Sequence, residues 1–255
     1  MQLFDLQGKV AIVTGGNGGI GLGIARGLAQ AGASIAVAAR NPEKTRSAVD
    51  QLAALGVEAI PLQVDVSVPD QVQRMVAETV ASLGGVDILV ANAGMSIRKR
   101  PETYSVEEWT TVINTNLNGV FSCCHAVYAR MKTRGGGKIV TIGSMTSLLG
   151  LDMAAPYTAT KGGVMQLTKS LASAWARDNI QVNCILPGWI ETDLTHGARK
   201  AIPRLNDNVV DRTPMKRWGR PEDLAGAAVF LCSAASDFVT GVALPVDGGF
   251  SSSMF

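Results

Sequence analysis

The sequence contains few residues of the kinds that build metal centres. Its 255 residues include only two histidines and four cysteines, and the cysteines show no metal-ligand spacing: Cys123, Cys124, Cys184 and Cys232. We therefore expect no metal site. We also expect these cysteines to be reduced thiols, as is usual in a cytoplasmic protein.

Long apolar runs and blocks of charge are missing as well. No run approaches the roughly 20 residues that a membrane-spanning helix needs. Asp5 and Lys9, before a short apolar run, do not resemble a signal peptide. Charged residues make up 17% of the chain, and the net charge is only +2. We therefore expect neither a nucleic-acid nor a membrane partner.

What the sequence does contain is an alternation of apolar runs and helical patterns. The runs are continuous, which is typical of parallel strands buried on both faces. Strands are expected at 9–14, 34–39, 57–64, 86–91, 137–142, 180–186 and 241–246. Helices are expected at 19–31, 43–55, 69–83, 105–132, 154–177 and 221–234. The pattern predicts one α/β domain over residues 1–255, a Rossmann-type doubly wound parallel sheet of about seven strands with helices on both faces.

Two segments differ from this alternation. Pro61 lies inside the third run and has no amide hydrogen to donate to a neighbouring strand, which favours a short or edge strand. Residues 187–216 are polar with only weak helical patterns. Such a segment is typical of a mobile cap over a site.

A glycine-rich turn joins the first predicted strand to the first predicted helix. It reads Thr14-Gly15-Gly16-Asn17-Gly18-Gly19-Ile20-Gly21. Without β-carbons the backbone can approach a pyrophosphate closely, and the N-terminus of a helix stabilises the negative charge. The turn therefore indicates a dinucleotide site. Two glycine registers fit it: Gly16/Gly18/Gly21 and Gly15/Gly19/Gly21.

The end of the second predicted strand indicates which dinucleotide binds. An NAD site offers a carboxylate to the adenosine ribose there, whereas an NADP site offers an arginine. The sequence reads Ala38-Ala39-Arg40-Asn41, with no acid before Glu43. Because the planar guanidinium of Arg40 can pair with a 2′-phosphate, the predicted cofactor is NADP(H).

Three further residues indicate proton-transfer chemistry. Tyr157 and Lys161 stand four residues apart in a predicted helix, which puts phenol and ammonium on one face. A free tyrosine titrates near ~10, and a neighbouring ammonium would lower its pKa towards the neutral range. The hydroxyl of Ser144, upstream in the chain, could hold a substrate oxygen while the tyrosine exchanges a proton with it.

Taken together, these residues resemble the short-chain dehydrogenase/reductase family over roughly residues 5–250. The motifs are Thr14-Gly15-x-x-x-Gly19-x-Gly21, Asp65-Val66, Asn92-Ala93-Gly94, Asn116-Leu117, Ser144, Tyr157-x-x-x-Lys161, Pro187-Gly188 and Asp247-Gly248-Gly249. The resemblance implies a nicotinamide cofactor without a metal, and it selects the Gly15/Gly19/Gly21 register. It also implies a homotetramer, whose interfaces are expected at 154–177, 221–234, Phe250, Met254 and Phe255.

The same resemblance implies the residues of the site. The catalytic ones are Asn116, Ser144, Tyr157 and Lys161, with the main-chain carbonyl of Asn116 holding a water that reaches Lys161. The flanking Asn114 and Asn118 are set aside on the Asn-Leu-x-Gly-Val-Phe match. The cofactor-binding ones are Gly15, Asn17, Gly19, Ile20, Gly21, Arg40, Asp65, Val66, Asn92, Ala93, Gly94, Tyr157, Lys161, Pro187, Gly188, Ile190 and Thr192.

The substrate is indicated only by the segment after Asn92-Ala93-Gly94. The pattern Asn-Ala-Gly-x-x-x-Arg, which ends at Arg98, and the Gly-Ser-Met at 143–145 resemble the gluconate 5-dehydrogenase and deoxygluconate dehydrogenase branch of the family. Basic residues there could bind a sugar-acid carboxylate, and the alternative is a solvated basic loop. The candidate substrate residues are Arg98, Arg100, Met145 and His196.

The sequence thus predicts an NADP(H)-dependent oxidoreductase that interconverts a ketone and a secondary alcohol by hydride transfer, on a sugar acid or a similar small polar carbonyl compound. Two other enzymes share the motifs, a 3-oxoacyl-[acyl-carrier-protein] reductase and a broad-specificity ketone or glucose reductase. A non-catalytic NADP(H)-binding sensor is a further alternative. The intact Ser144, Tyr157 and Lys161 disfavour that sensor.

Overall fold

All the predicted strands form in the computed structural model, which describes residues 2–252 without the side chains of residues 2, 194, 200 and 201. Met254 and Phe255, expected at a subunit interface, lie outside the described residues. The strands pair in parallel in the order β3-β2-β1-β4-β5-β6-β7. Their bounds are β1 Val10–Thr14, β2 Ser34–Ala39, β3 Ala59–Gln63, β4 Ile88–Ala91, β5 Gly137–Ile142, β6 Ile180–Pro187 and β7 Ala243–Val246.

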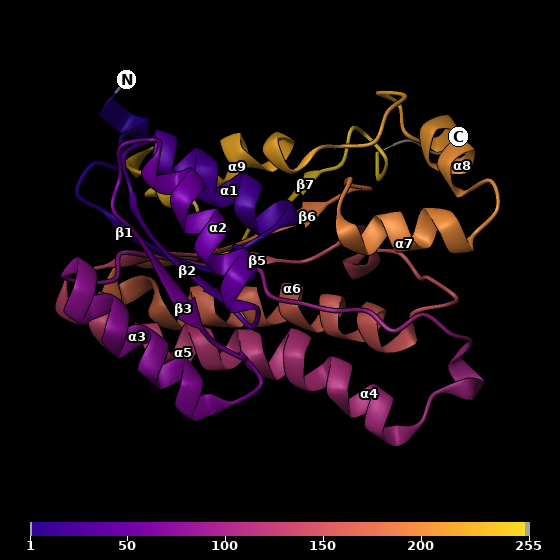
Figure 1. Cartoon of the computed structure of the whole chain (residues 1–255), viewed down its shortest axis with the longest axis horizontal. Coiled ribbons are helices and arrows are strands. Elements are labelled where there is room, and N and C mark those ends of the chain that lie inside the picture. Colours follow the sequence, from indigo (N-terminus) through magenta and orange to yellow (C-terminus); the bar gives the residue numbers. More distant parts are fainter. Residues whose placement is uncertain (1, 253–255) are drawn as a thin grey trace.

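Helices cover both faces of this sheet, which confirms the predicted fold class (Figure 1). One face carries α1 (Gly19–Gln30), α2 (Pro42–Ala53) and α9 (Ala225–Cys232). The other carries α3 (Pro69–Leu83), α5 (Gly119–Thr133) and α6 (Ala155–Trp175). The edge position expected from Pro61 is also confirmed, because β3 pairs only with β2.

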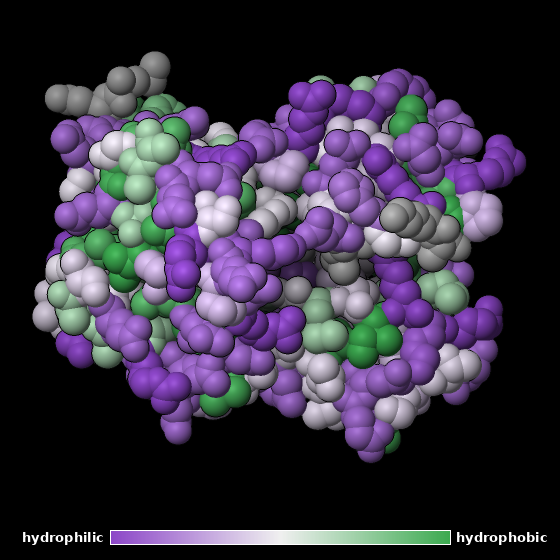
Figure 2. Space-filling view, viewed as in Figure 1, coloured by the Kyte–Doolittle hydropathy of each residue, from purple (hydrophilic) through white to green (hydrophobic). Residues whose placement is uncertain are grey.

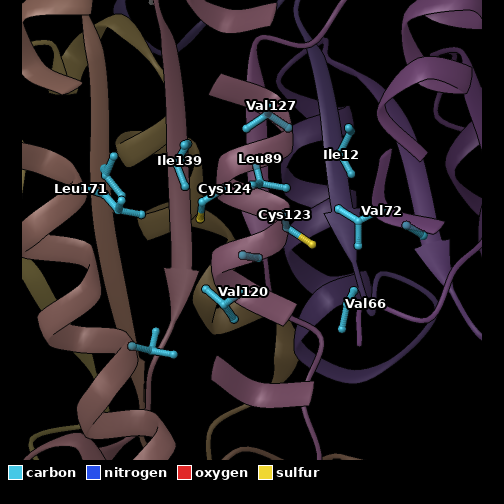
Figure 3. Packing of buried hydrophobic residues seen from close by; sticks show 14 of the residues in the cluster. Ile12, Val66, Val72, Leu89, Val120, Cys123, Cys124, Val127, Ile139 and Leu171 are labelled. Carbon is cyan, nitrogen blue, oxygen red and sulfur yellow. The ribbon is translucent and has the colours of Figure 1, made fainter. Parts of the chain in front are cut away.

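Two apolar cores form because successive strand residues point to opposite faces. On β1, Ile12 packs towards α3 and α5, whereas Ala11 and Val13 pack towards α1 and α9. Figure 3 shows the first core, where Leu89 and Ile139 of the sheet face the α5 side chains. Each fully buried aliphatic side chain contributes about 1.5–3 kcal/mol. Because all the strand pairs are parallel, their carboxyl ends lie at one edge of the sheet.

The helix expected at 105–132 is interrupted. It consists of α4 (Val106–Ile113), a π-helical turn over Asn114–Asn118 and then α5. Within the turn, the amide of Gly119 donates to the carbonyl of Asn114, five residues earlier. Single π-turns of this kind are frequent at functional sites. The helix expected at 221–234 also differs, because a 3₁₀ turn over Pro221–Leu224 precedes α9.

The segment expected to be a cap contains two short helices, α7 (Asp193–Ala201) and α8 (Leu205–Arg212). They lie at one end of the molecule, on the side where α4 begins (Figure 1). The segment packs on a small apolar cluster of its own, centred on Trp218, and the guanidinium of Arg199 stacks 3.7 Å from that ring's centre. These contacts hold the two helices together as one unit.

Hydrophilic side chains predominate on the face of the molecule in Figure 2, with hydrophobic ones scattered between them. Within residues 2–252, no helix combines the length and the hydropathy that a membrane crossing requires. Phe250, expected at a subunit interface, is only 7% exposed and packs under Arg212 of its own chain. Its own chain thus covers most of the ring, and the expected interface role of Phe250 stays a prediction.

Candidate functional site

A cleft of about 840 Å³ opens at the carboxyl ends of the strands. It is lined by every residue that the sequence places at the cofactor, from Gly15 to Thr192, and by Ser144, Tyr157 and Lys161. In parallel sheets ligands bind at this edge. The other lining residues are not among the predicted cofactor-binding or catalytic residues; they are Gly18, Ala38, Ala39, Asn41, Pro42, Lys44, Val64, Thr115, Ile142, Gly143, Asp193 and Thr195.

The glycine turn forms a cradle that side chains would fill. Gly15 and Gly19 have φ angles of 63° and 49°, a region that favours glycine. A β-carbon on Gly21 would lie 2.2 Å from the carbonyl oxygen of Gly15, whereas one on Gly18 would meet nothing within 4 Å. Helix α1 begins here without a side-chain cap, so its first amides remain available to an anion. The turn therefore fits a dinucleotide pyrophosphate.

Asn92 joins this turn to the neighbouring strand. Its side-chain amide donates to the carbonyl oxygens of Thr14 (2.9 Å) and Gly15 (3.1 Å), and its backbone amide donates to the Thr14 hydroxyl (3.0 Å). Sequence reasoning placed Asn92 beside the ribose. In the structure its amide group is engaged in holding the shape of the turn.

Arg40 is exposed directly after β2 and lines the cleft, where the sequence predicts the adenosine ribose. Burial raises the pKa of the Asp65 carboxyl, but hydrogen bonds from Ser67 and the charge of Arg40 together hold it below its usual value. Lys44 faces the same space and pairs with Asp193 of α7 at 3.1 Å. The signal for Lys44 was its place in the first turn of α2, where Asn41 caps its amide at 2.9 Å.

Tyr157 and Lys161 lie one turn apart on α6, as their spacing requires. The lysine is only 4% exposed, and its Nζ donates to the carbonyl oxygen of Ile142 at 2.7 Å. The same Nζ lies 5.5 Å from the centre of the Tyr157 ring. Burial lowers the pKa of Lys161 to about 8. The ammonium is thus close to the phenol, but it is bonded to a backbone carbonyl.

The pKa of Tyr157 departs from what the sequence suggested. Burial raises it above its ordinary value, and only the Ser144 hydroxyl and the charge of Arg98 act in the opposite direction. The expectation that Lys161 lowers this pKa is not met in this structure, because the lysine is buried, has a lowered pKa itself and is bonded to Ile142. The positive charge that lowers the pKa of Tyr157 in this structure is that of Arg98.

Ser144 is held by a short turn after β5. Its Oγ accepts from the amide of Thr146 at 3.1 Å, and its own amide donates to the Oγ of Ser147 at 3.2 Å. The Ser147 hydroxyl in turn donates to the carbonyl oxygen of Lys161 at 2.7 Å. Ser147, which sequence reasoning missed, thus ties the serine turn to α6. Its position three residues after Ser144 was the available signal.

Asn116 lies in the π-helical turn, is buried and does not line the cleft. Its amide group accepts from the backbone nitrogen of Met95 and donates to the carbonyl oxygen of the same residue, both at 2.8 Å. It also donates to the Thr160 hydroxyl at 3.3 Å. The side chain therefore joins the loop after β4 to α6. The role expected for its main-chain carbonyl stays a prediction.

None of the four candidate substrate residues lines the cleft, and Arg98 is the one whose charge acts on Tyr157. Arg100 is exposed and pairs with Glu102 at 2.7 Å. Met145 is 6% exposed and belongs to the apolar core, and His196 is exposed on α7. An ion pair thus accounts for Arg100 and burial for Met145, and His196 lies exposed on α7.

Arg98 is partly buried, and burial lowers its pKa. A guanidinium nevertheless keeps its charge in proteins. Its neighbours Lys99 and Arg100 pair with Glu108 and Glu102, and within the described residues no carboxylate pairs with Arg98. A cation in this position can accept an anionic group beside the phenol of Tyr157.

Known proteins resemble this chain over almost its whole length. The family model described as enoyl-(acyl carrier protein) reductase matches residues 15–251. Gluconate 5-dehydrogenase of Gluconobacter oxydans (strain 621H) is 44% identical over 253 residues, covering 99% of this chain and 98% of that protein. A 2-dehydro-3-deoxy-D-gluconate 5-dehydrogenase of Escherichia coli (strain K12) is 41% identical over 251 residues, covering 98% of both.

A crystal structure is equally similar. Gluconate 5-dehydrogenase from Burkholderia cenocepacia J2315, solved in complex with NADP and tartrate, superposes with a TM-score of 0.94 at 43% identity and 99% coverage of both chains. The resemblance to the gluconate and deoxygluconate dehydrogenase branch that the sequence suggested is thereby confirmed. The chain belongs to the short-chain dehydrogenase/reductase family.

Proposed function

We propose that the protein is an NADP(H)-dependent oxidoreductase that interconverts the ketone and the secondary alcohol of a small sugar acid, such as 5-ketogluconate and gluconate. The observation that carries the acidic substrate is Arg98, a partly buried cation with no carboxylate partner among the described residues, beside Tyr157. Relatives named for gluconate and ketogluconate support the same choice. Arg40 at the end of β2, and neighbours solved with NADP, support the cofactor.

Each residue of the site then has a distinct part in the reaction. The nicotinamide, when bound, supplies or accepts the hydride. The Tyr157 hydroxyl gives a proton to the substrate oxygen in reduction and takes it back in oxidation. Ser144 hydrogen-bonds the same oxygen. Lys161 adds positive charge near the phenol, and Arg98 binds the carboxylate, so that the carbonyl carbon is held in one orientation.

Removing the Arg98 charge should weaken binding of the acid without stopping the chemistry. We expect Arg98→Ala to raise the KM for 5-keto-D-gluconate about 10- to 100-fold, the usual share of a hydrogen bond to a charged group. The KM for a neutral ketone should change little. Steady-state kinetics with NADPH and both substrates would measure the difference, and added salt should raise only the KM of the acid.

Arg100→Ala is the matched control, because Arg100 stands two residues away and pairs with exposed Glu102. It should leave both KM values near the wild type. The sugar-acid proposal fails if the wild type reduces neutral ketones more efficiently than ketogluconates, and if neither Arg98→Ala nor added salt changes the KM for either substrate. A general ketone reductase would then be the better description. Preferential turnover of an acetoacetyl thioester would instead indicate a 3-oxoacyl carrier-protein reductase.

We also propose a homotetramer, which family membership supports. Exposed apolar side chains on α4 and α5 offer a surface for it, with Val106 at 76%, Trp109 at 41% and Phe121 at 47% exposure. Closed homo-oligomers bury such self-complementary patches. Multi-angle light scattering should give a mass of about four chains. A monodisperse monomer at micromolar concentration would contradict this proposal.

We further propose that the chain is a single domain in which residues 187–216 act as a cap over the cleft. Thr192, Asp193 and Thr195 of this segment line the cleft.

We propose a cytoplasmic location as well, which is supported by the cysteines at 123, 124, 184 and 232, all of which are free and buried. Cell fractionation with an antibody to the chain would test the location.

A further inference from the structure

The loop between β4 and the 3₁₀ turn at Pro101–Thr103 carries Arg98 but has no regular secondary structure of its own. An arginine on such a loop would sample many rotamers, and ordering it on substrate binding would cost affinity. Arg98 itself forms no ion pair with a described carboxylate. The loop must therefore be held by its neighbours if the guanidinium is to stay beside Tyr157.

Contacts on both sides of Arg98 hold the backbone. The Tyr104 hydroxyl donates to the carbonyl oxygen of Ile97 at 2.6 Å. The Lys99 amide donates to the carbonyl oxygen of Met153 at 3.0 Å. Residues 97 and 99, directly before and after the arginine, are thus both fixed to other segments of the chain.

The strongest of these contacts is an ion pair from Lys99 to the start of α4. Its Nζ lies 2.8 Å and 2.7 Å from the two carboxylate oxygens of Glu108, and both side chains are only 33% exposed. The same ammonium lies 5.8 Å from the centre of the Tyr104 ring. Lys99 is therefore paired with α4, whereas the charge of its neighbour Arg98 acts on Tyr157.

Glu108 is itself held in place. Its Oε2 accepts from the amide of Ser105 at 2.9 Å, while the Ser105 hydroxyl accepts from the amide of Glu108 at 3.2 Å, forming a capping box. Hydrogen bonds from Lys99 and from Ser105 hold the pKa of Glu108 below its usual value, so the carboxylate is charged at neutral pH. The helix thus presents a fixed anion to the loop.

We infer that Glu108, acting through Lys99, is a positioning residue that keeps the Arg98 guanidinium beside Tyr157 and thereby sets the preference for substrates that carry a carboxylate. This inference rests on the proposed function. Glu108 contacts neither the cleft nor the catalytic group. Its effect on the reaction must therefore pass through the loop.

Glu108→Gln isolates the ion pair. Glutamine keeps the length of the side chain and can still accept from the Ser105 amide, so the capping box remains. We expect the KM for 5-keto-D-gluconate to rise about 3- to 10-fold, because Arg98 loses part of its pre-organisation. The kcat and the KM for a neutral ketone should stay near the wild type. Lys99→Met should reproduce this result, and Lys99→Arg should restore most of the wild-type KM.

Ser105→Ala is the matched control, because it weakens the same capping box without touching Lys99. Its KM for the acid should equal that of the wild type. A double-mutant cycle gives the sharper test: in an Arg98→Ala background, Glu108→Gln should have no further effect. Hydrogen exchange provides a readout without turnover, since the Lys99 amide should exchange faster in Glu108→Gln and normally in Ser105→Ala.

An unchanged KM in Glu108→Gln would overturn the inference. An equal rise in the KM for the neutral ketone would also overturn it. So would a rise in the KM for the acid that is just as large in the Arg98→Ala background. These results differ from failure of the proposed function, which would appear as a wild type that reduces no ketogluconate. If the wild type reduces ketogluconate normally and Glu108→Gln leaves its KM unchanged, only the role of Glu108 is contradicted.

Discussion

Replacing Tyr157 with phenylalanine is expected to lower kcat about 10²- to 10⁴-fold, the usual contribution of a positioned proton donor. The substitution removes one oxygen and leaves the ring in its place on α6. Since burial raises the pKa of this phenol, it is protonated at neutral pH and ready to donate in the reductive direction. NADPH binding should be almost unchanged, because the cradle at the glycine turn lies elsewhere in the cleft.

Two measurements would separate chemistry from binding here. Single-turnover oxidation of NADPH reports the chemical step, and quenching of protein fluorescence reports the cofactor Kd. Tyr128→Phe is a suitable control, because the Tyr128 hydroxyl donates to Asp178 at 2.6 Å and lies outside the cleft. Near-normal kcat in Tyr157→Phe would end the assignment of this residue as the acid.

The fold could be predicted because its signals are local. Continuous apolar runs mark strands that are buried on both faces, and Pro61 marks the edge, since its missing amide is tolerated where only one neighbour pairs. The π-helical turn could not be predicted in this way. The backbone distortion at Asn116 is accompanied by side-chain bonds to Met95 and Thr160, which are distant in the sequence.

In the site, too, features that depend on local sequence could be predicted, and those that depend on distant contacts could not. The glycine turn, Tyr157 and Lys161 follow from short spacings, and all line one cleft. The basic residues after β4 look equivalent in the sequence, yet each has a different partner. Lys99 pairs with Glu108 and Arg100 pairs with Glu102, whereas Arg98 has no such partner among the described residues and its charge acts on Tyr157. Which of the three basic side chains is available to a substrate depends on the ion pairs that form in the folded chain.

The cofactor preference should reverse when the end of β2 is changed. We expect the wild type to favour NADPH over NADH in kcat/KM. In Ala39→Asp combined with Arg40→Leu, the ratio should shift about 10³-fold towards NADH. The reason is that the 2′-phosphate of NADPH loses the attraction of the Arg40 guanidinium and is repelled by the new carboxylate at position 39. Ala39 is the last residue of β2, and both positions line the cleft, so a carboxylate there can reach the ribose hydroxyls.

The double variant needs a control for the loss of positive charge alone. Arg46→Leu provides it, because Arg46 is exposed on α2 and does not line the cleft. Its NADPH/NADH ratio should match that of the wild type. Lys44 lines the cleft and remains in both variants, so some attraction for the 2′-phosphate persists in each. Equal efficiency with NADH and NADPH in the wild type would contradict the role of Arg40, since a guanidinium that pairs with the 2′-phosphate must favour the cofactor that carries it.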